Sequence, residues 1–204
     1  IIQYSQVEKA FKENPIGHEA KFRRARVAYF QGQFDWAQAQ LDVLKGSTTK
    51  LIANNAMQLS LLITDNMGLD TSAQAMQMYS QAELLIYQNK NDESYQLLDS
   101  MLSTFPGHSL SDEIIYKQAE IEFYNKNYTQ AVKLYEKVAT EFSFDILADD
   151  AFFKWAEILE EKLNDISKAQ EIYEKIVMDY SDSIYTVESR KRFRKLRGDQ
   201  NEEL

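Results

Sequence analysis

The chain has 204 residues, of which 23 are Lys or Arg and 32 are Asp or Glu, so its formal net charge is −9. It holds 6 Gly, 2 Pro and no Cys, and 12% of its residues are aromatic. The absence of Cys excludes disulfides, cysteine-ligated metal sites and a thiol nucleophile. So few Gly and Pro argue against an all-β fold, which needs a turn about every 8–12 residues. The negative balance disfavours general attraction to nucleic acid or an anionic membrane. A long, mostly helical chain remains.

The first residues already follow a helical pattern, with Ile1, Tyr4, Val7 and Phe11 on one face. Because the chain opens inside this pattern and without an initiator Met, we interpret it as a fragment whose native N-terminus has been removed. A first helix–turn–helix unit is predicted over residues 18–46.

Residues 50–73 interrupt the regular pattern. A helical stretch over 51–65 is followed by a turn in which Gly68 would end the helix in a left-handed conformation, and a long helix is predicted to begin near Thr71 or Ser72. This segment is either a degenerate repeat or an extra helix, and we favour the extra helix.

Internal repeats dominate the rest of the chain. Residues 79–87, 116–124 and 153–161 align without gaps: each begins with an aromatic residue and has Ala-Glu at its fourth and fifth positions, and their starts are 37 residues apart. A second motif recurs at Phe105, Phe142 and Tyr180, with spacings of 37 and 38, so one extra residue falls in the turn over 162–165. Apolar residues recur every 3–4 positions within a unit, which indicates two helices joined by a tight turn. Stacking such pairs buries a continuous core, so the sequence predicts a solenoid.

The repeating unit resembles the tetratricopeptide repeat, although the family's period is 34 residues. Residues 119–143 supply the family's pattern of small, aromatic and large apolar residues: Ala119, Tyr128, Ala131, Tyr135 and Val138, with Ser143 in place of the closing Pro. The resemblance implies an all-α fold, a right-handed α-solenoid of stacked antiparallel helix pairs that forms one domain over residues 1–204. Its regular units run approximately over 18–46, 74–107, 110–144 and 147–181, with a capping helix over 183–197.

The capping helix is predicted from a basic run. Residues 190–197 hold six cations and no acid, so the rest of the chain carries −15. By register, Arg194 falls where the earlier units have the small Ala, which would prevent another repeat from docking. The alternative is contact with a polyanion or an acidic partner. A second basic run, over residues 21–26, is predicted to lie on a helix surface, with contact to an acidic ligand as its alternative.

The resemblance also implies a partner-binding groove, because the first helices of tetratricopeptide arrays line a concave face. Two repeated slots would point into this groove, the aromatic one and the one after the small residue. The aromatic slot holds Phe22, Tyr79, Tyr116 and Phe153. The slot after the small residue holds Arg26, Glu83, Glu120 and Glu157. Aromatic rings give a large contact area for little lost rotamer entropy, but these rings could instead form the core between repeats. The three Glu predict an acidic groove and a basic or polar partner segment, unlike the carboxylate clamp of chaperone-binding members, which needs Lys, Arg and Asn.

Catalytic chemistry is not expected. The two histidines, His18 and His108, each precede a first helix and are interpreted as loop or helix-start residues, and no nucleotide-binding, zinc-protease or hydrolase motif is present. Paired carboxylates at helix starts favour the helix dipole, and a third pair is interpreted as a solvated helix face rather than a metal site. These pairs are Asp112-Glu113, Asp149-Asp150 and Glu160-Glu161. We therefore predict no catalytic residue, no metal and no cofactor.

The sequence thus predicts a non-catalytic protein–protein interaction scaffold that binds a segment of a protein or peptide partner in the concave groove. The alternative is a structural repeat block that positions a neighbouring domain of a larger protein and has no ligand of its own. No nucleic acid and no membrane span are expected. The unit closures resemble those of bacterial cell-envelope members of the family, which implies a periplasmic or outer-membrane-associated protein, with a cytoplasmic one as the alternative.

Overall fold

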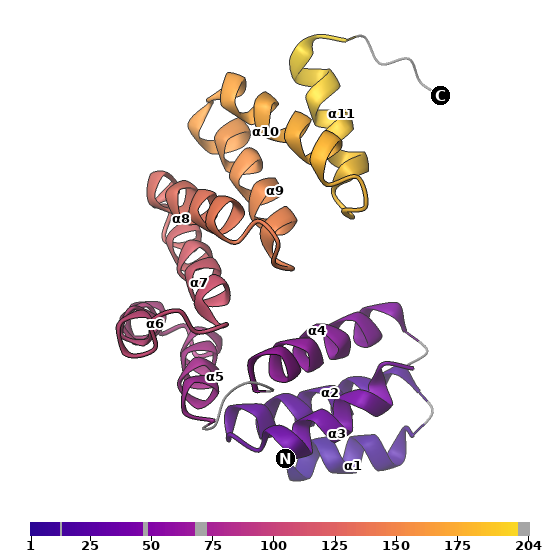
Figure 1. Ribbon diagram of the computed structural model, residues 1–204. Coiled ribbons are helices and arrows are strands. Elements are labelled where there is room, and N and C mark those ends of the chain that lie inside the picture. Colours follow the sequence, from indigo (N-terminus) through magenta and orange to yellow (C-terminus); the bar gives the residue numbers. More distant parts are fainter. Residues whose placement is uncertain (13, 47–48, 68–72, 200–204) are drawn as a thin grey trace. The chain divides into compact units, whose positions relative to one another are not determined.

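The computed structural model describes residues 1–12, 14–46, 49–67 and 73–199, which form helices joined by short turns, with no β-strand among them (Figure 1). The chain divides into two compact units, Ile1–Leu110 and Ser111–Leu204. The prediction of an all-α fold built from helix pairs is confirmed, whereas the single domain over residues 1–204 stays a prediction.

The first unit contains six helices in its described part. These are α1 (Ile2–Ala10), α2 (Pro15–Phe30), α3 (Phe34–Leu44), α4 (Lys50–Met67), α5 (Gln74–Tyr87) and α6 (Asn91–Thr104). Helix α2 packs against α1, α3 and α5, α4 packs on α3, and α5 pairs with α6. The start of α2 follows from its sequence: Pro15 is its first residue, and the Asn14 side chain accepts a hydrogen bond from the Ile16 N–H at 3.0 Å.

The described part of the irregular stretch contains one helix, α4, and the choice between an extra helix and a degenerate repeat stays a prediction. Gly68 and the expected helix start at Thr71 or Ser72 lie outside the described residues. Helix α5 begins at Gln74.

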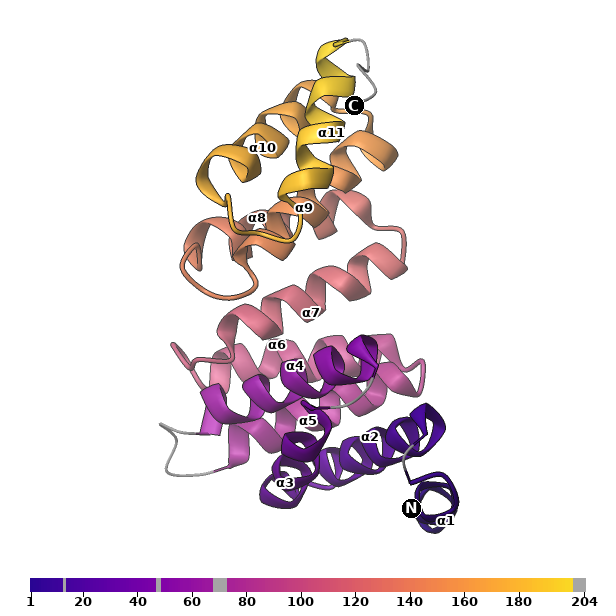
Figure 2. The same ribbon diagram turned by 90° about the vertical axis from the view of Figure 1, so that its right-hand side faces the viewer.

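The second unit is a run of helices in which each packs on the next (Figure 2). It consists of α7 (Ser111–Tyr124), α8 (Tyr128–Glu141), α9 (Ala148–Ile158), the π-helical turn Leu159–Leu163, α10 (Ile166–Asp179) and α11 (Thr186–Arg197). Helix α11 packs on α10 and contains the basic run that the sequence assigns to a capping helix.

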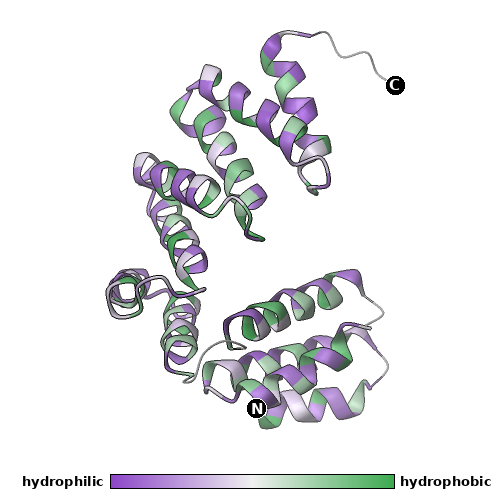
Figure 3. Cartoon of the chain, viewed as in Figure 1, coloured by the Kyte–Doolittle hydropathy of each residue, from purple (hydrophilic) through white to green (hydrophobic). Residues whose placement is uncertain are grey.

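The small slots of the repeats are fully buried positions of the core. Hydrophobic and hydrophilic residues alternate along the helices (Figure 3), and the small residues on the packed faces have no exposed surface. They are Ala25, Ala82, Ala119 and Ala156 in the first helices, and Ala37, Ser94, Ala131 and Ala169 in the second helices. Ser94 takes the place of Ala by donating its buried hydroxyl to the Ala82 carbonyl at 2.9 Å.

Each helix pair turns through one residue in the left-handed region, and these residues share one position of the repeat. They are Gly32 (φ 72°), Asn89 (φ 59°), Lys126 (φ 65°) and Asn164 (φ 55°). In the first three turns the next N–H donates to the carbonyl five residues earlier, as Asn127 does to Glu122 at 2.8 Å. Gly and Asn tolerate this conformation, whereas Lys126 adopts it at a steric cost.

The fourth turn absorbs the extra residue of the 38-residue spacing. The Asp165 N–H reaches the Leu159 carbonyl, six residues earlier, at 2.9 Å, and the chain forms the π-helical turn Leu159–Leu163. The sequence places the insertion at 162–165, so the distortion begins earlier than predicted. Such π-helical turns are rare and often lie at functional sites, and this one carries Glu160 and Glu161.

Candidate functional site

The aromatic slots of the first helices are largely part of the core. Phe22, Tyr79 and Phe153 are 7%, 1% and 6% exposed, so these three rings have little surface to offer a partner. Tyr116 is partly exposed and packs edge-on against Tyr135, with ring centroids 5.2 Å apart. Phe153 stacks on Tyr185 at 4.4 Å. The alternative interpretation, core between repeats, therefore describes the three buried rings.

The slots that hold Glu83, Glu120 and Glu157 remain accessible, and both carboxylates of the second unit have a cationic neighbour. The Lys117 Nζ is 2.7 Å from Glu120 Oε2, and the Lys154 Nζ is 2.9 Å from Glu157 Oε2. Each Lys lies one turn before its Glu on the same helix, where such pairs form readily. The row is therefore mixed in charge in the second unit, rather than purely acidic. In the first unit, Glu83 Oε2 accepts a hydrogen bond from the Tyr29 hydroxyl at 2.7 Å.

The densest charged cluster of the second unit surrounds Arg192 of α11. Its guanidinium contacts carboxylates of α9, the π-helical turn and α11 itself. The nitrogen–oxygen distances are 3.4 Å to Glu157, 3.0 Å to Glu160, 2.9 Å to Glu161 and 3.2 Å to Glu188. The same guanidinium lies 5.7 Å from the Phe153 ring centroid. Arg192 thus covers the aromatic and acidic slots of the last repeat.

This cluster corrects the interpretation of a solvated face for Glu160, whereas Glu161 is 41% exposed as that interpretation expects. The Glu160 side chain is only 11% exposed, and it also accepts a hydrogen bond from the Tyr173 hydroxyl at 2.9 Å. The Arg192 hydrogen bond holds the pKa of the Glu161 carboxyl below its usual value. The two acids therefore anchor the last helix to the repeat before it.

A pocket in the first unit contains one of the predicted site residues. It has a volume of about 390 Å³ and is lined by side chains of α1, α2 and α5 and by Gln31. Its lining residues are Tyr4, Glu19, Arg23, Arg26, Val27, Phe30, Gln31, Leu84 and Tyr87. The Arg26 guanidinium lies 5.5 Å from the ring centroids of both Phe30 and Tyr87. Of the eight predicted positions, Arg26 is the one that lines this pocket.

Four other titratable residues lie at helix starts or just before them. His108 Nδ1 accepts a hydrogen bond from the Leu110 N–H at 3.0 Å, just before α7, as expected for a helix-start residue. Asp112 and Asp149 lie in the first turns of α7 and α9. Burial raises the pKa of the Asp150 carboxyl, although a 2.6 Å hydrogen bond from the Tyr185 hydroxyl opposes the shift. No group of His, Asp and Glu among the described residues could hold a metal ion.

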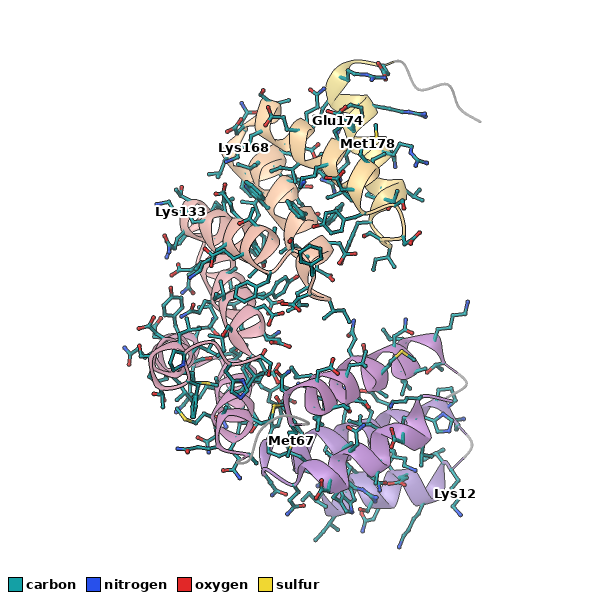
Figure 4. All side chains as sticks on the ribbon, in the orientation of Figure 1. Lys12, Met67, Lys133, Lys168, Glu174 and Met178 are labelled. Atoms are coloured by element: carbon teal, nitrogen blue, oxygen red, sulfur yellow. The ribbon has the colours of Figure 1, made fainter. Side chains whose placement is uncertain are left out.

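Another cation, Lys168, contacts side chains of the two preceding helices, α8 and α9. Lys168 of α10, labelled in Figure 4, lies 4.8 Å from the Trp155 ring centroid and 3.5 Å from Glu136 Oε1. Within the part of the chain that the structure describes, no helix is long and apolar enough to cross a membrane.

These features define an α-helical repeat protein, and comparison with known proteins supports one family. Residues 113–143 and 150–183, both in the second unit, match the tetratricopeptide repeat family. A crystal structure described as "Podosopora anserina putative kinesin light chain nearly identical TPR-like repeats" is similar with a TM-score of 0.53 and 14% sequence identity, over 89% of this chain and 87% of that one. At this identity the likeness concerns the fold. No curated protein sequence matches the chain. The similarity to cell-envelope members stays a prediction.

Sequence reasoning missed the pocket and the Arg192 cluster for different reasons. The pocket is lined by side chains from helices far apart in the sequence, so no local sequence pattern predicts it. The signal for the charge pairing was present, because Lys117 and Lys154 each stand three residues before a Glu and are themselves 37 residues apart. Arg192 occupies the same register position 38 residues later.

Proposed function

We propose that the chain is a protein-interaction module that binds a segment of a partner polypeptide along its first helices. Tetratricopeptide folds generally mediate protein–protein interaction, and their members are typically non-catalytic scaffolds. The observation that carries the proposal is the pocket around Arg26, because it combines a predicted groove residue with exposed aromatic surface. Pockets of a few hundred cubic ångströms in which apolar surface meets convergent polar groups are typical of binding sites.

The partner segment is proposed to be polar, with charges of both signs available to it. A cationic side chain of the partner would have to displace Lys117 from Glu120, and both Lys154 and Arg192 from Glu157. These pairs are partly exposed, and such pairs contribute at most about 1 kcal/mol, so a partner could rearrange them. We retain a periplasmic or outer-membrane-associated location as a proposal that rests on the unit closures.

Peptide arrays of basic, acidic and neutral polar segments test this function. Binding of the wild-type chain is compared with that of three variants in the charged slots, Glu83→Gln, Glu120→Gln and Glu157→Gln. Glu174→Gln is the matched control, because Glu174 is exposed on α10, a second helix (Figure 4). We expect at least one slot variant to change the set of bound peptides while the control does not.

Two results would contradict the proposal. If no peptide binds the folded chain, the chain is better explained as a structural repeat block that positions a neighbouring domain. If the slot variants change binding no more than Glu174→Gln does, the three Glu positions are not part of the binding surface. Far-UV circular dichroism of each variant separates a lost contact from lost folding.

A further inference from the structure

Three arginines of the run over residues 21–26 lie on α2, and their surroundings differ. Arg23 Nε donates to Glu19 Oε1 at 2.7 Å, and Arg24 Nη1 lies 2.7 Å from Glu8 Oε2. Arg26 forms no ion pair with any carboxylate of the described residues. The run therefore contains two arginines whose charges are matched inside the unit and one whose charge is not.

Arg26 is nevertheless held in place by aromatic rings. Its guanidinium lies 5.5 Å from the centroid of Phe30 on its own helix and 5.5 Å from that of Tyr87 on α5. The two rings are themselves 6.3 Å apart. A guanidinium in contact with aromatic faces keeps its edge N–H groups available as donors and loses less freedom when it binds a ligand. Arg26 is therefore a pre-oriented cation with free donors.

The pocket beside this cation has an apolar wall. Val27 of α2 and Leu84 of α5 line it, and Tyr87, which is 61% exposed, borders it. An aromatic residue this exposed beside aliphatic side chains offers apolar surface that the first unit does not itself cover. The wall suits an apolar side chain, whereas Arg26 suits an anion.

We propose that this pocket binds a partner polypeptide at a point where an apolar side chain stands next to an Asp or Glu. The proposal rests on the function proposed above and names the partner's chemistry at this site. The apolar side chain packs against Leu84 and Tyr87, and the neighbouring carboxylate accepts charge-assisted hydrogen bonds from Arg26. Charge complementarity favours this occupant, because the one carboxylate that lines the pocket, Glu19, already pairs with Arg23. A basic segment would meet two arginines there.

Three fluorescein-labelled peptides of equal length and apolar content test the inference. They are Gly-Ser-Leu-Glu-Phe-Asp-Ser-Gly, its amide analogue with Gln and Asn, and its cationic analogue with two Lys. Fluorescence anisotropy at low ionic strength measures their affinities for the whole chain. We expect the acidic peptide to bind about tenfold more tightly than the amide peptide, as one charge-assisted hydrogen-bonded contact implies.

Variants of the chain assign that preference to one side chain. Arg26→Gln is expected to abolish the preference for the acidic peptide, and Arg26→Lys to retain part of it, because Lys keeps the charge but not the planar fork of donors. Lys12→Gln is the matched control, because Lys12 is an exposed cation of the same unit that does not line the pocket, and it should leave the preference intact. Tyr87→Ala is expected to weaken the binding of the acidic and amide peptides equally, because it removes apolar surface from the pocket wall.

The outcomes separate this inference from the function on which it rests. If the acidic and amide peptides bind equally, or if the preference survives Arg26→Gln, the inference is wrong while polypeptide binding stands. If the cationic peptide binds best, the proposal that the pocket prefers an acidic partner is wrong. If hexanoate displaces the acidic peptide at comparable concentration, the occupant is a small carboxylic acid rather than a polypeptide. If no peptide binds here or on the arrays, both proposals fail.

Discussion

Replacing Arg192 with Gln should destabilise the second unit, because one guanidinium holds α11 to the last repeat. The Arg192 side chain is 19% exposed and that of Glu160 is 11% exposed, so both charges lie largely out of water. Breaking a buried ion pair by removing one partner costs about 3–5 kcal/mol. The other three carboxylates are 25–46% exposed and can regain water, which reduces the loss. We therefore expect the free energy of unfolding to fall by about 2–4 kcal/mol.

Urea denaturation followed by tryptophan fluorescence measures this loss in the relevant unit. The chain has two Trp, and a Trp36→Phe background leaves Trp155 of α9, which is 5% exposed, as the reporter of the second unit. Arg190→Gln is the matched control, since Arg190 is an exposed cation on the same helix, and its effect should stay within about 0.5 kcal/mol.

A double variant tests whether the loss comes from the stranded carboxylate. Adding Glu160→Gln to Arg192→Gln removes the uncompensated charge, so the two changes should cost less together than the total of their separate costs, by about 1 kcal/mol or more. If Arg192→Gln costs no more than Arg190→Gln, the cluster does not anchor α11 and the reasoning is refuted.

Three further predictions concern the second unit. Lys126→Gly should raise the free energy of unfolding by about 0.5–1 kcal/mol, because Gly adopts the left-handed conformation (φ 65°) without steric cost. The control Lys133→Gly, in the exposed middle of α8, should lower the free energy of unfolding by about 1 kcal/mol. Equal urea midpoints for the two variants would contradict the turn argument. Ala131→Leu overfills a slot with no exposed surface and should cost about 1–3 kcal/mol in the same assay, whereas an unchanged midpoint would mean that the helices do not approach closely there. Arg192 lowers the pKa of Glu161 from its ordinary 4.5, so the pairing of these two residues stabilises the folded state. This stabilisation is complete above about pH 4.5 and is lost as the pH falls through the lower, folded-state pKa. Thermal melts should therefore show a larger loss on acidification for the wild type than for Arg192→Gln, and parallel losses would contradict this.

The sequence predicts well those features that repeat. The positions of the small slots, such as Ala119 and Ala131, follow from their recurrence, because a helix pair can approach closely only where the side chains are small. The turn positions follow for the same reason. Features that occur once are harder to predict. The π-helical turn that carries Glu160 arises from a single extra residue. The spacing of the repeats shows that a residue is inserted, but not at which residue the helix becomes distorted.

The candidate site was predicted only in part, because a slot's register does not determine its exposure. Phe153 belongs to the aromatic row by sequence, yet Tyr185 stacks on it and removes it from solvent. Arg26 was found by register, but its pocket depends on Tyr87, which reaches it from α5. Contacts between helices distant in the sequence leave no local pattern.

The most direct measurement of the central claim is a methyl NMR titration of the chain, labelled at Leu and Val, with the acidic peptide. Val27 and Leu84 line the pocket, while Val43 of α3 and Val187 of α11, which are 63% and 77% exposed, serve as references. The account predicts saturable shifts of the Val27 and Leu84 signals that disappear in Arg26→Gln, with both references unmoved. Shifts confined to Val187, or no shifts in the pocket while the peptide binds, would contradict it.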